Sequence, residues 1–257
     1  MKILKFISPF LLFSFIFLFS CSDDDIDTVN EDPNPRAENI KQLGVSAEDL
    51  LSENTYKSLT VEFAYSPTYR PKQETIDDYK LFLEARLNKP NDITFIETVI
   101  DIPYSEFQSV EDIRQIEENK RTAYTQGDDI AVFVYFSNAN AEGDTATLLT
   151  LGSAYYNTSL VIFEKTLRYL ESSQNFDLYI LEETTLQHEF GHILGLVNIR
   201  EDDIHTVHED NAHRKHCIVE DCLMYYESNN GRTIKKRSAV PVLDPLCIED
   251  LQAKGGK

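Results

Sequence analysis

Hydrophobic and polar positions follow regular patterns through the middle of the chain, and these patterns predict its secondary structure. Residues 59–65 alternate apolar and polar side chains up to Pro67, which predicts a first strand. Residues 74–88 place their apolar side chains on one stripe before Pro90, as an amphipathic helix does. The same criteria predict a helix over residues 110–121 and strands over residues 93–102 and 129–137.

The order strand, helix, strand, helix, strand predicts the fold class. It indicates an α/β fold with a mixed, mainly parallel sheet backed by helices, because parallel strands are joined through right-handed crossovers. Two shorter strands are predicted near residues 147–155 and 160–163, with Gly152 and Asn157 marking their ends. Since no repeat or low-complexity block interrupts residues 45–250, we expect one domain there.

A longer helix, predicted over residues 178–194, contains the residues with the clearest chemistry. Asp177 is a suitable N-cap and Gly195 a suitable end for this helix. Inside it, His188, Glu189 and His192 form the sequence H-E-x-x-H. A spacing of four residues places both imidazoles on one face, where they can share a Zn²⁺ ion, while the glutamate can accept a proton from water. The alternative is a helix surface with two solvated histidines.

A hydrolytic zinc site commonly has three protein ligands and one open position, so a third donor is required. Residues 188–198 read HEFGHILGLVN, which resembles the H-E-x-x-H-x-x-G-x-x-H signature of the metzincin metalloproteases. In that family the glycine, here Gly195, lets the chain turn back toward the metal. Asn198 stands in the place of the third histidine, and an amide oxygen is a poor zinc ligand beside imidazole.

A later segment supplies a replacement. Residues 216–224 read HCIVEDCLM, which resembles the H-C-x-x-x-x-C-x-M segment of the archaemetzincin branch. The resemblance implies that His216 is the third ligand and that Met224 packs beneath the metal. Residues 199–215 are then an inserted polar loop, which could form a lid. The other candidates for the third ligand are His213 and His208, followed by Asn198 and His205.

Tyr226 and three cysteines extend the resemblance. Several metzincins carry a tyrosine at the place of Tyr226 that can stabilise the tetrahedral intermediate, so a catalytic role is implied; packing at the pocket rim is the alternative. Archaemetzincins also use further cysteines for a second, structural zinc site. Here Asp250 stands where another cysteine would be expected, so a site with three cysteines and Asp250, or a Cys217–Cys222 disulfide, stays open. The cysteines are Cys217, Cys222 and Cys247.

The N-terminus has the features of a secretory signal peptide. Two lysines precede an apolar stretch shorter than the roughly 20 residues that a membrane-spanning helix needs. Residues 18–21, LFSC, resemble the lipobox of bacterial lipoproteins, in which the cysteine, here Cys21, is lipidated; the acidic run 22–25 resembles the export signal of Bacteroidetes surface lipoproteins. We expect a signal peptide over residues 1–20, a polar acidic tether over residues 21–45 and a zinc metalloprotease domain over residues 46–257, anchored by lipid at the outer membrane or cell surface.

Charge and composition narrow the possible partners. The chain is 42% hydrophobic, as globular proteins are, and its 44 acidic and 24 basic residues give a net charge of −20. Such a charge disfavours nucleic acid and anionic membrane surfaces. We therefore expect a peptide or protein substrate, the lipid on Cys21 as the only membrane contact, and a monomer.

The expected activity is that of a zinc metalloendopeptidase. Zn²⁺ held by His188, His192 and His216 would activate water, and Glu189 would act as general base and then protonate the leaving amine. An edge strand near residues 153–156 would align the substrate, as the metzincin resemblance implies. The alternative, favoured by Asn198 and the inserted loop, is a zinc-containing surface lipoprotein that binds or scaffolds without cutting.

Overall fold

The structure, a computed structural model, describes residues 34–226 and 238–257. The expectations for the signal peptide, for Cys21 and for the acidic run 22–25 fall outside these residues. Within them, no helix combines the length and the apolar character that crossing a membrane requires.

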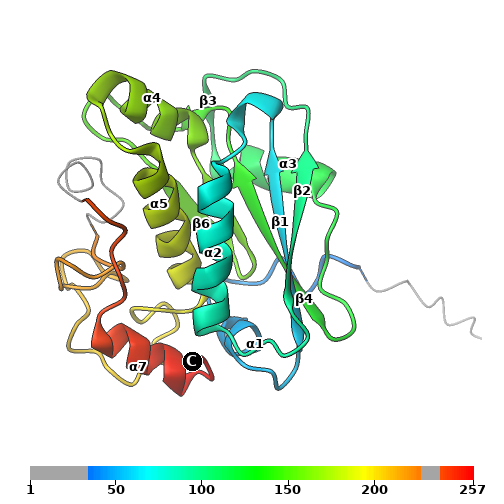
Figure 1. The fold of residues 1–257 in the computed structure, drawn as a ribbon, viewed down its shortest axis with the longest axis vertical. Helices are drawn as coiled ribbons and strands as arrows, with labels where there is room; N and C mark the ends of the chain where they lie inside the picture. The colour runs from blue at the N-terminus through cyan, green and yellow to red at the C-terminus, as the bar shows by residue number, and fades with distance from the viewer. Residues whose placement is uncertain (1–33, 227–237) are drawn as a thin grey trace, which may run out of the picture. The chain divides into compact units, whose positions relative to one another are not determined.

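A five-stranded sheet with the order β2-β1-β4-β7-β6 forms the centre of the described domain (Figure 1). The first four strands in this order are parallel, and β6 pairs antiparallel with β7 at one edge. The predicted α/β fold with a mainly parallel sheet is therefore confirmed. The strands are β1 (Ser58–Tyr65), β2 (Ile93–Val99), β4 (Asp129–Phe136), β6 (Gly152–Tyr156) and β7 (Ser159–Ile162).

Helices cover both faces of this sheet. The helices α2 (Gln73–Arg86), α4 (Glu164–Gln174) and α5 (Leu178–Ile193) pack together on one face, and α3 (Val110–Lys120) lies on the other (Figure 1). Alternate side chains of β4 enter the two cores, because successive residues of a strand point to opposite faces. The arrangement places α5 next to the edge strand β6.

Several elements depart from the sequence patterns. β2 ends at Val99 instead of continuing to residue 102. The strand predicted near residues 147–155 starts only at Gly152, because the preceding residues form turns in which the Thr145 N–H donates to the Leu148 carbonyl (2.8 Å). The patterns also missed α4 and five short elements, which are α1 (Ala47–Leu51), the 3₁₀ helix η1 (Pro67–Tyr69), β3 (Phe107–Gln108), β5 (Asn140–Ala141) and α7 (Pro245–Ala253).

Residues 34–45, which composition assigns to the tether, lie against the domain. Asn39 is fully buried, and its side-chain amide donates to Thr125 Oγ1 and to the Ala131 carbonyl (both 2.9 Å). The Lys41 N–H donates to the side chain of Asn157 (2.8 Å). Residues 34–45 therefore belong to the same compact unit as the rest of the described domain.

Candidate metal centre

The helix α5 positions the first three residues of the site. The Asp177 carboxylate caps its start by accepting from the N–H groups of Tyr179 (2.9 Å) and Ile180 (3.4 Å), as predicted. Gly195, with a φ of +75°, turns the chain away just beyond its end. Because α5 lies between the sheet and the helices α2 and α4, nearly all of its residues are buried.

Three histidines converge at the end of this helix. His188 and His192 come from α5, and His216 comes from the loop segment that follows it. The nitrogens that could bind a metal all lie within 4.8 Å of one another. His188 Nδ1 lies 2.8 Å from the Leu223 carbonyl, a contact that orients this ring and leaves its Nε2 available. The structure thus brings together the three histidines that the sequence singled out.

Burial keeps these histidines in the form that binds metals. Removal from water lowers the pKa of His188 to about 4 and also lowers the pKa of His192 and His216. The rings are therefore neutral at pH 7, as metal ligation requires. His192 Nδ1 is buried without a hydrogen-bond partner among the described residues. A buried polar atom without a partner costs free energy, which a bound metal or water molecule would offset. This donor set fits Zn²⁺.

Glu189 lies between the histidines and the sheet edge. Its Oε2 accepts a hydrogen bond from the Ala154 N–H of β6 (2.8 Å), and burial raises its pKa to about 8. The carboxyl group is therefore tethered to the strand and suited to holding a proton near neutral pH. It faces a hollow of about 350 Å³ lined by residues 149–154, His188, Glu189, His192, His216 and Tyr226, which we call the catalytic hollow.

Met224 packs against α5 at the H-E-x-x-H sequence. Its side chain is fully buried, and a Cβ added at Gly191 of α5 would overlap its sulfur. The glycine inside the H-E-x-x-H sequence therefore allows the methionine to pack directly against the helix.

Tyr226 reaches the catalytic hollow from the chain just beyond Met224. Its ring stacks flat on His213, with 3.5 Å between ring centroids and an interplanar angle of 2°. His213 Nδ1 in turn lies 2.8 Å from Asp210 Oδ2. His213 is therefore a stacking partner of the tyrosine and does not belong to the group of three histidines.

The other candidates for the third ligand also lie elsewhere. The Asn198 side-chain amide donates to Glu209 Oε2 (3.1 Å), and His205 Nε2 lies 2.7 Å from Glu249 Oε2. Residues 199–215 contain no helix or strand and do not line the catalytic hollow, so this loop does not cover the site as a lid in this structure.

A second group of metal-binding side chains surrounds His208. Its Nδ1 lies 3.6 Å from Cys217 Sγ and 3.7 Å from Cys247 Sγ. Cys222 Sγ lies 3.8 Å from Cys247 Sγ, and no disulfide joins these cysteines, so the Cys217–Cys222 disulfide is not formed. Neighbouring thiols lower the pKa of Cys217, which favours a thiolate. Asp244 is the carboxylate beside these sulfurs, since its Oδ2 lies 3.2 Å from Cys217 Sγ and 3.7 Å from His208 Nδ1. The donor atoms of His208, Cys217, Cys247 and Asp244 lie within 4.8 Å of one another. We call these four residues, together with the adjoining Cys222, the sulfur site.

The sulfur site corrects the sequence-based interpretation of two residues. Asp250 does not stand among the sulfurs, because its Oδ2 contacts the outer nitrogen of His208, Nε2, at 2.9 Å. A carboxylate in this position orients a metal-binding histidine. His208 was considered only for the catalytic metal, and no spacing in the sequence could have revealed its place here, since the contacting Cys247 and Asp250 lie about forty residues further along. Thiolates and imidazole together form a donor set typical of structural zinc.

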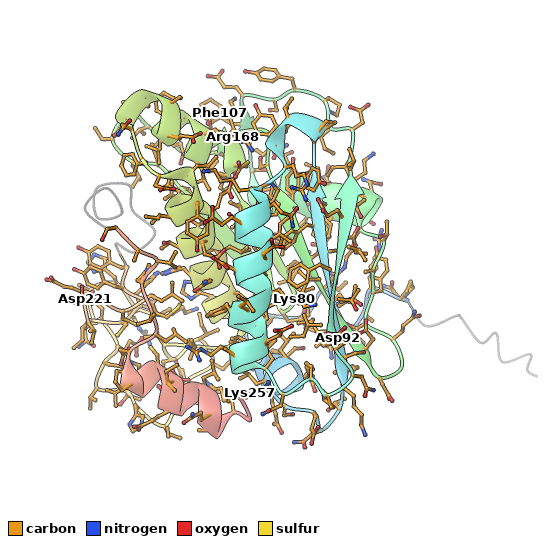
Figure 2. All side chains as sticks on the ribbon, in the orientation of Figure 1. Lys80, Asp92, Phe107, Arg168, Asp221 and Lys257 are labelled. Atoms are coloured by element: carbon orange, nitrogen blue, oxygen red, sulfur yellow. The ribbon has the colours of Figure 1, made fainter. Side chains whose placement is uncertain are left out.

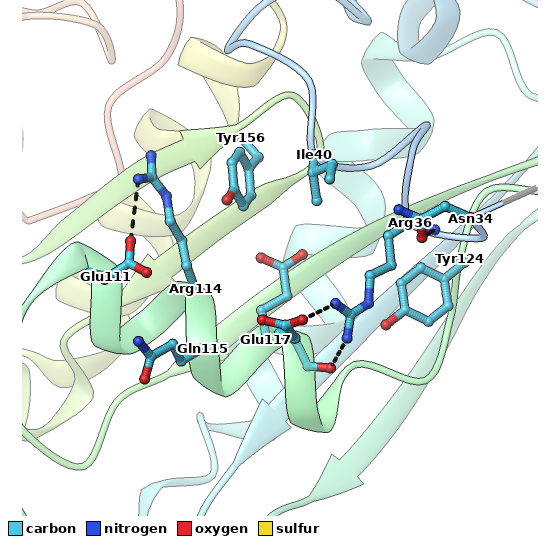
Figure 3. Close-up of a pocket in the computed structure, with 10 residues that line it drawn as sticks. Asn34, Arg36, Ile40, Glu111, Arg114, Gln115, Glu117, Tyr124 and Tyr156 are labelled. Atoms are coloured by element: carbon cyan, nitrogen blue, oxygen red, sulfur yellow. Dashed lines mark hydrogen bonds and ion pairs between the residues drawn. The ribbon is translucent and has the colours of Figure 1, made fainter.

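A separate hollow of about 360 Å³ lies between residues 34–40, α3 and the end of β6 (Figure 3). Its charged groups already have partners. Arg36 Nη1 contacts Glu118 Oε1 at 2.5 Å, Arg114 Nη1 lies 3.8 Å from Glu111 Oε2, and Glu117 Oε1 lies 2.7 Å from Arg121 Nη1. Since none of the three histidines lines this hollow, we assign it no part of the metal chemistry.

The chain was compared with known protein families, curated sequences and solved structures. No protein-family model matches the chain, and no curated protein sequence does. Among solved structures, an archaemetzincin from Methanopyrus kandleri is similar at 16% identity and a TM-score of 0.49, over 78% of this chain and 96% of the other. A zinc-dependent peptidase from Methanocorpusculum labreanum is similar at 13% identity and a TM-score of 0.44, over 74% and 99%. Likeness at this level does not establish a family or an activity, so the functional conclusion rests on the residues of the site.

Proposed function

We propose that the protein is a zinc-dependent peptidase in which His188, His192 and His216 hold Zn²⁺ and Glu189 is the general base. One observation carries this proposal: three neutral imidazoles, His188 buried and His192 and His216 partly exposed, converge beside the buried Glu189 of α5 at the edge of the sheet. Among the described residues, the group offers three donors and no fourth, as expected for a site that keeps a position for a substrate. This observation favours an enzyme over a binding module.

The proposed zinc ion, Glu189 and the Ala154 N–H have different roles in peptide hydrolysis. When bound, zinc supplies a Lewis acid that lowers the pKa of water and polarises a carbonyl group. Glu189 accepts a proton from the attacking water and gives it to the leaving amine. Burial raises the pKa of Glu189 to about 8 and favours the protonated form, and a zinc ion held beside it would favour the carboxylate that accepts the proton. The Ala154 N–H holds the carboxylate in place for both transfers.

Two further features act on the substrate. The free edge of β6 offers backbone groups that can pair with an extended peptide. Tyr226 lines the catalytic hollow, where its hydroxyl donates to the oxyanion that forms during hydrolysis, an interaction worth about 3 kcal/mol when the donor is well placed. Stacking on His213 restricts the tyrosine ring to one orientation.

The sulfur site has a different role in this proposal. His208, Cys217, Cys222 and Cys247 are buried and hold a structural zinc that ties the loop after α5 to α7. For the parts outside the described residues, we propose that Cys21 carries lipid and that residues 22–33 tether the enzyme at the outer surface of a bacterial cell.

Replacement of Glu189 tests the mechanism. Glu189→Gln should abolish hydrolysis of peptides and keep both zinc ions, because the amide cannot accept the proton but retains the size of the side chain. Zinc content and peptide cleavage, followed by mass spectrometry, measure both effects. Glu171→Gln on the exposed surface of α4 is the matched control and should behave as wild type. Undiminished cleavage by Glu189→Gln would rule out its role as general base.

A further inference from the structure

A second hollow, of about 350 Å³, adjoins the catalytic hollow and shares Leu149 with it. We call it the α4 hollow. Its walls come from Phe107 of β3, from the loop before β6 with Ala146 and Leu149, and from Thr166 and Tyr169 of α4. Figure 2 labels Phe107 beside α4, whose Thr166 and Tyr169 line the same hollow. Three segments that are distant in sequence therefore enclose one space next to the catalytic residues.

The α4 hollow exposes large apolar side chains to solvent. Phe107 is 42% exposed and Tyr169 55%, and Leu148, at 66%, precedes the shared Leu149. Single exposed apolar residues are common, but several around one concave space indicate a binding surface. The charged side chains of the lining are engaged in part: Asp144 Oδ1 accepts from the Thr150 N–H (2.8 Å), and Lys165 Nζ lies 5.0 Å from the centroid of the Tyr104 ring. Asp144 Oδ2 is buried without a hydrogen-bond partner among the described residues.

The course of β6 relates this hollow to a bound peptide. The Ala154 N–H contacts Glu189, so the bond to be cleaved lies near Ala154. A peptide that pairs antiparallel with β6, the more stable of the two pairings, runs from Tyr156 toward Gly152 in its own N-to-C direction. Leu149 precedes Gly152 by three residues, and an extended chain advances about 3.3 Å per residue. The α4 hollow therefore lies on the C-terminal side of the cleaved bond.

We propose that the α4 hollow is a specificity pocket for an apolar, preferably aromatic, side chain of the substrate, about two to four residues after the cleaved bond. This inference rests on the proposed peptidase activity and adds the class of substrate. Tyr169 and Phe107 both line the pocket, and their rings offer apolar surface to the inserted side chain. A polar residue at this position of the peptide does not bury the apolar lining of the pocket, so such peptides are cleaved more slowly.

Cleavage of matched peptides tests the specificity pocket. The peptides share one cleavable core and carry a single phenylalanine or serine at each of four positions on either side of the cleaved bond. The wild-type protein should show a kcat/KM about tenfold higher for phenylalanine than for serine on the C-terminal side, the range that one buried apolar group provides. Tyr169→Ser and Phe107→Ser should each reduce this ratio to about twofold or less. Leu81→Ser, at a residue of α2 that is 61% exposed, is the control and should keep the ratio.

The possible results distinguish failure of the specificity-pocket proposal from failure of the peptidase proposal. Equal rates for phenylalanine and serine, a preference confined to the N-terminal side, or an unchanged ratio in both pocket variants would overturn the proposal. If the wild type cleaves none of the peptides, the peptidase proposal fails, and the pocket is then tested by binding of the same peptides to Glu189→Gln, followed by fluorescence anisotropy. Tighter binding of the phenylalanine peptide that Tyr169→Ser removes would uphold the pocket alone; equal binding would overturn it.

Discussion

Gly152 determines how closely the edge strand approaches the active-site helix. A Cβ built at this glycine would lie 2.7 Å from Thr185 Cγ2 and 2.8 Å from Glu189 Cγ, closer than real carbon atoms approach. In the sequence this glycine reads only as a strand end. In the structure it is the residue that lets β6 lie against the general base, and a glycine within a strand often marks such a close approach of two backbones.

We predict that Gly152→Ala lowers kcat and leaves both zinc ions bound. The added methyl group displaces Glu189 or the strand, and a misplacement of about 1 Å near reacting atoms can cost on the order of a hundredfold in rate. Steady-state kinetics and zinc analysis measure the two effects. The control is Glu171→Ala, at an exposed residue of α4, which should keep the wild-type kcat. A Gly152→Ala protein with wild-type kcat would show that the close approach has no part in positioning the base.

The residues of the metal site could be predicted from the sequence to different extents. His188, Glu189 and His192 follow from helical periodicity alone, because their spacing places them on one helix face. His216 could be reached only through a resemblance, since a loop separates it from α5. His208, an alternative for the third ligand in the sequence, has a place that the sequence could not predict, because its contact to Asp250 crosses 42 residues and depends on how the loop after α5 returns to α7.

At the scale of elements, the best-predicted features are those with strong local signals. β1, β4 and α5 lie within one or two residues of their expected bounds, because alternation, a continuous apolar run and good caps define them. The prediction missed α4, which offers few apolar positions, and α7, which has nine residues. The latter does carry local signals, since Pro245 occupies its first turn and the Asp244 carboxylate caps it.

The helix α5 buries a carboxyl group that the mechanism does not use. Glu183 is almost fully buried against α2, and its Oε1 accepts from Gln187 Nε2 (2.6 Å). Burial raises the pKa of Glu183 from 4.5 to about 8. The unfolded chain therefore releases this proton at lower pH than the folded chain, so the residue lowers the stability progressively as the pH rises from about 4.5 to about 8.

We predict that Glu183→Gln stabilises the fold at pH 8 by up to about 4 kcal/mol and has little effect at pH 4. Glutamine is neutral at both pH values and can accept the same hydrogen bond. Denaturant unfolding at pH 4, 6 and 8 measures the difference from wild type. Glu171→Gln, on an exposed residue of α4, should change the free energy of unfolding by less than about 0.5 kcal/mol at each pH. A difference for Glu183→Gln that does not grow with pH would contradict this account.

At the scale of the whole domain, the sheet and the C-terminal region are stabilised differently. The sheet and its helices bury a large apolar core, which the sequence patterns predicted. The described residues after α5 contain one helix, α7, and otherwise turns and isolated bridges. The three-histidine site and the sulfur site are neighbours in this region, because His216 belongs to the first and the next residue, Cys217, to the second. Such an arrangement leaves little periodic signal, which is why the sequence predicted the fold of this part least well.

The most direct test of the account is the zinc content of the purified protein, measured together with peptide hydrolysis, for wild type and three histidine variants. We predict two zinc ions per wild-type chain. His216→Ala should lose one of them and all hydrolysis, and His208→Ala should lose the other. His213→Ala should keep both, since His213 contacts Tyr226 and neither group of donors. Full zinc content and undiminished hydrolysis in His216→Ala would contradict the central claim that His188, His192 and His216 form the catalytic metal site.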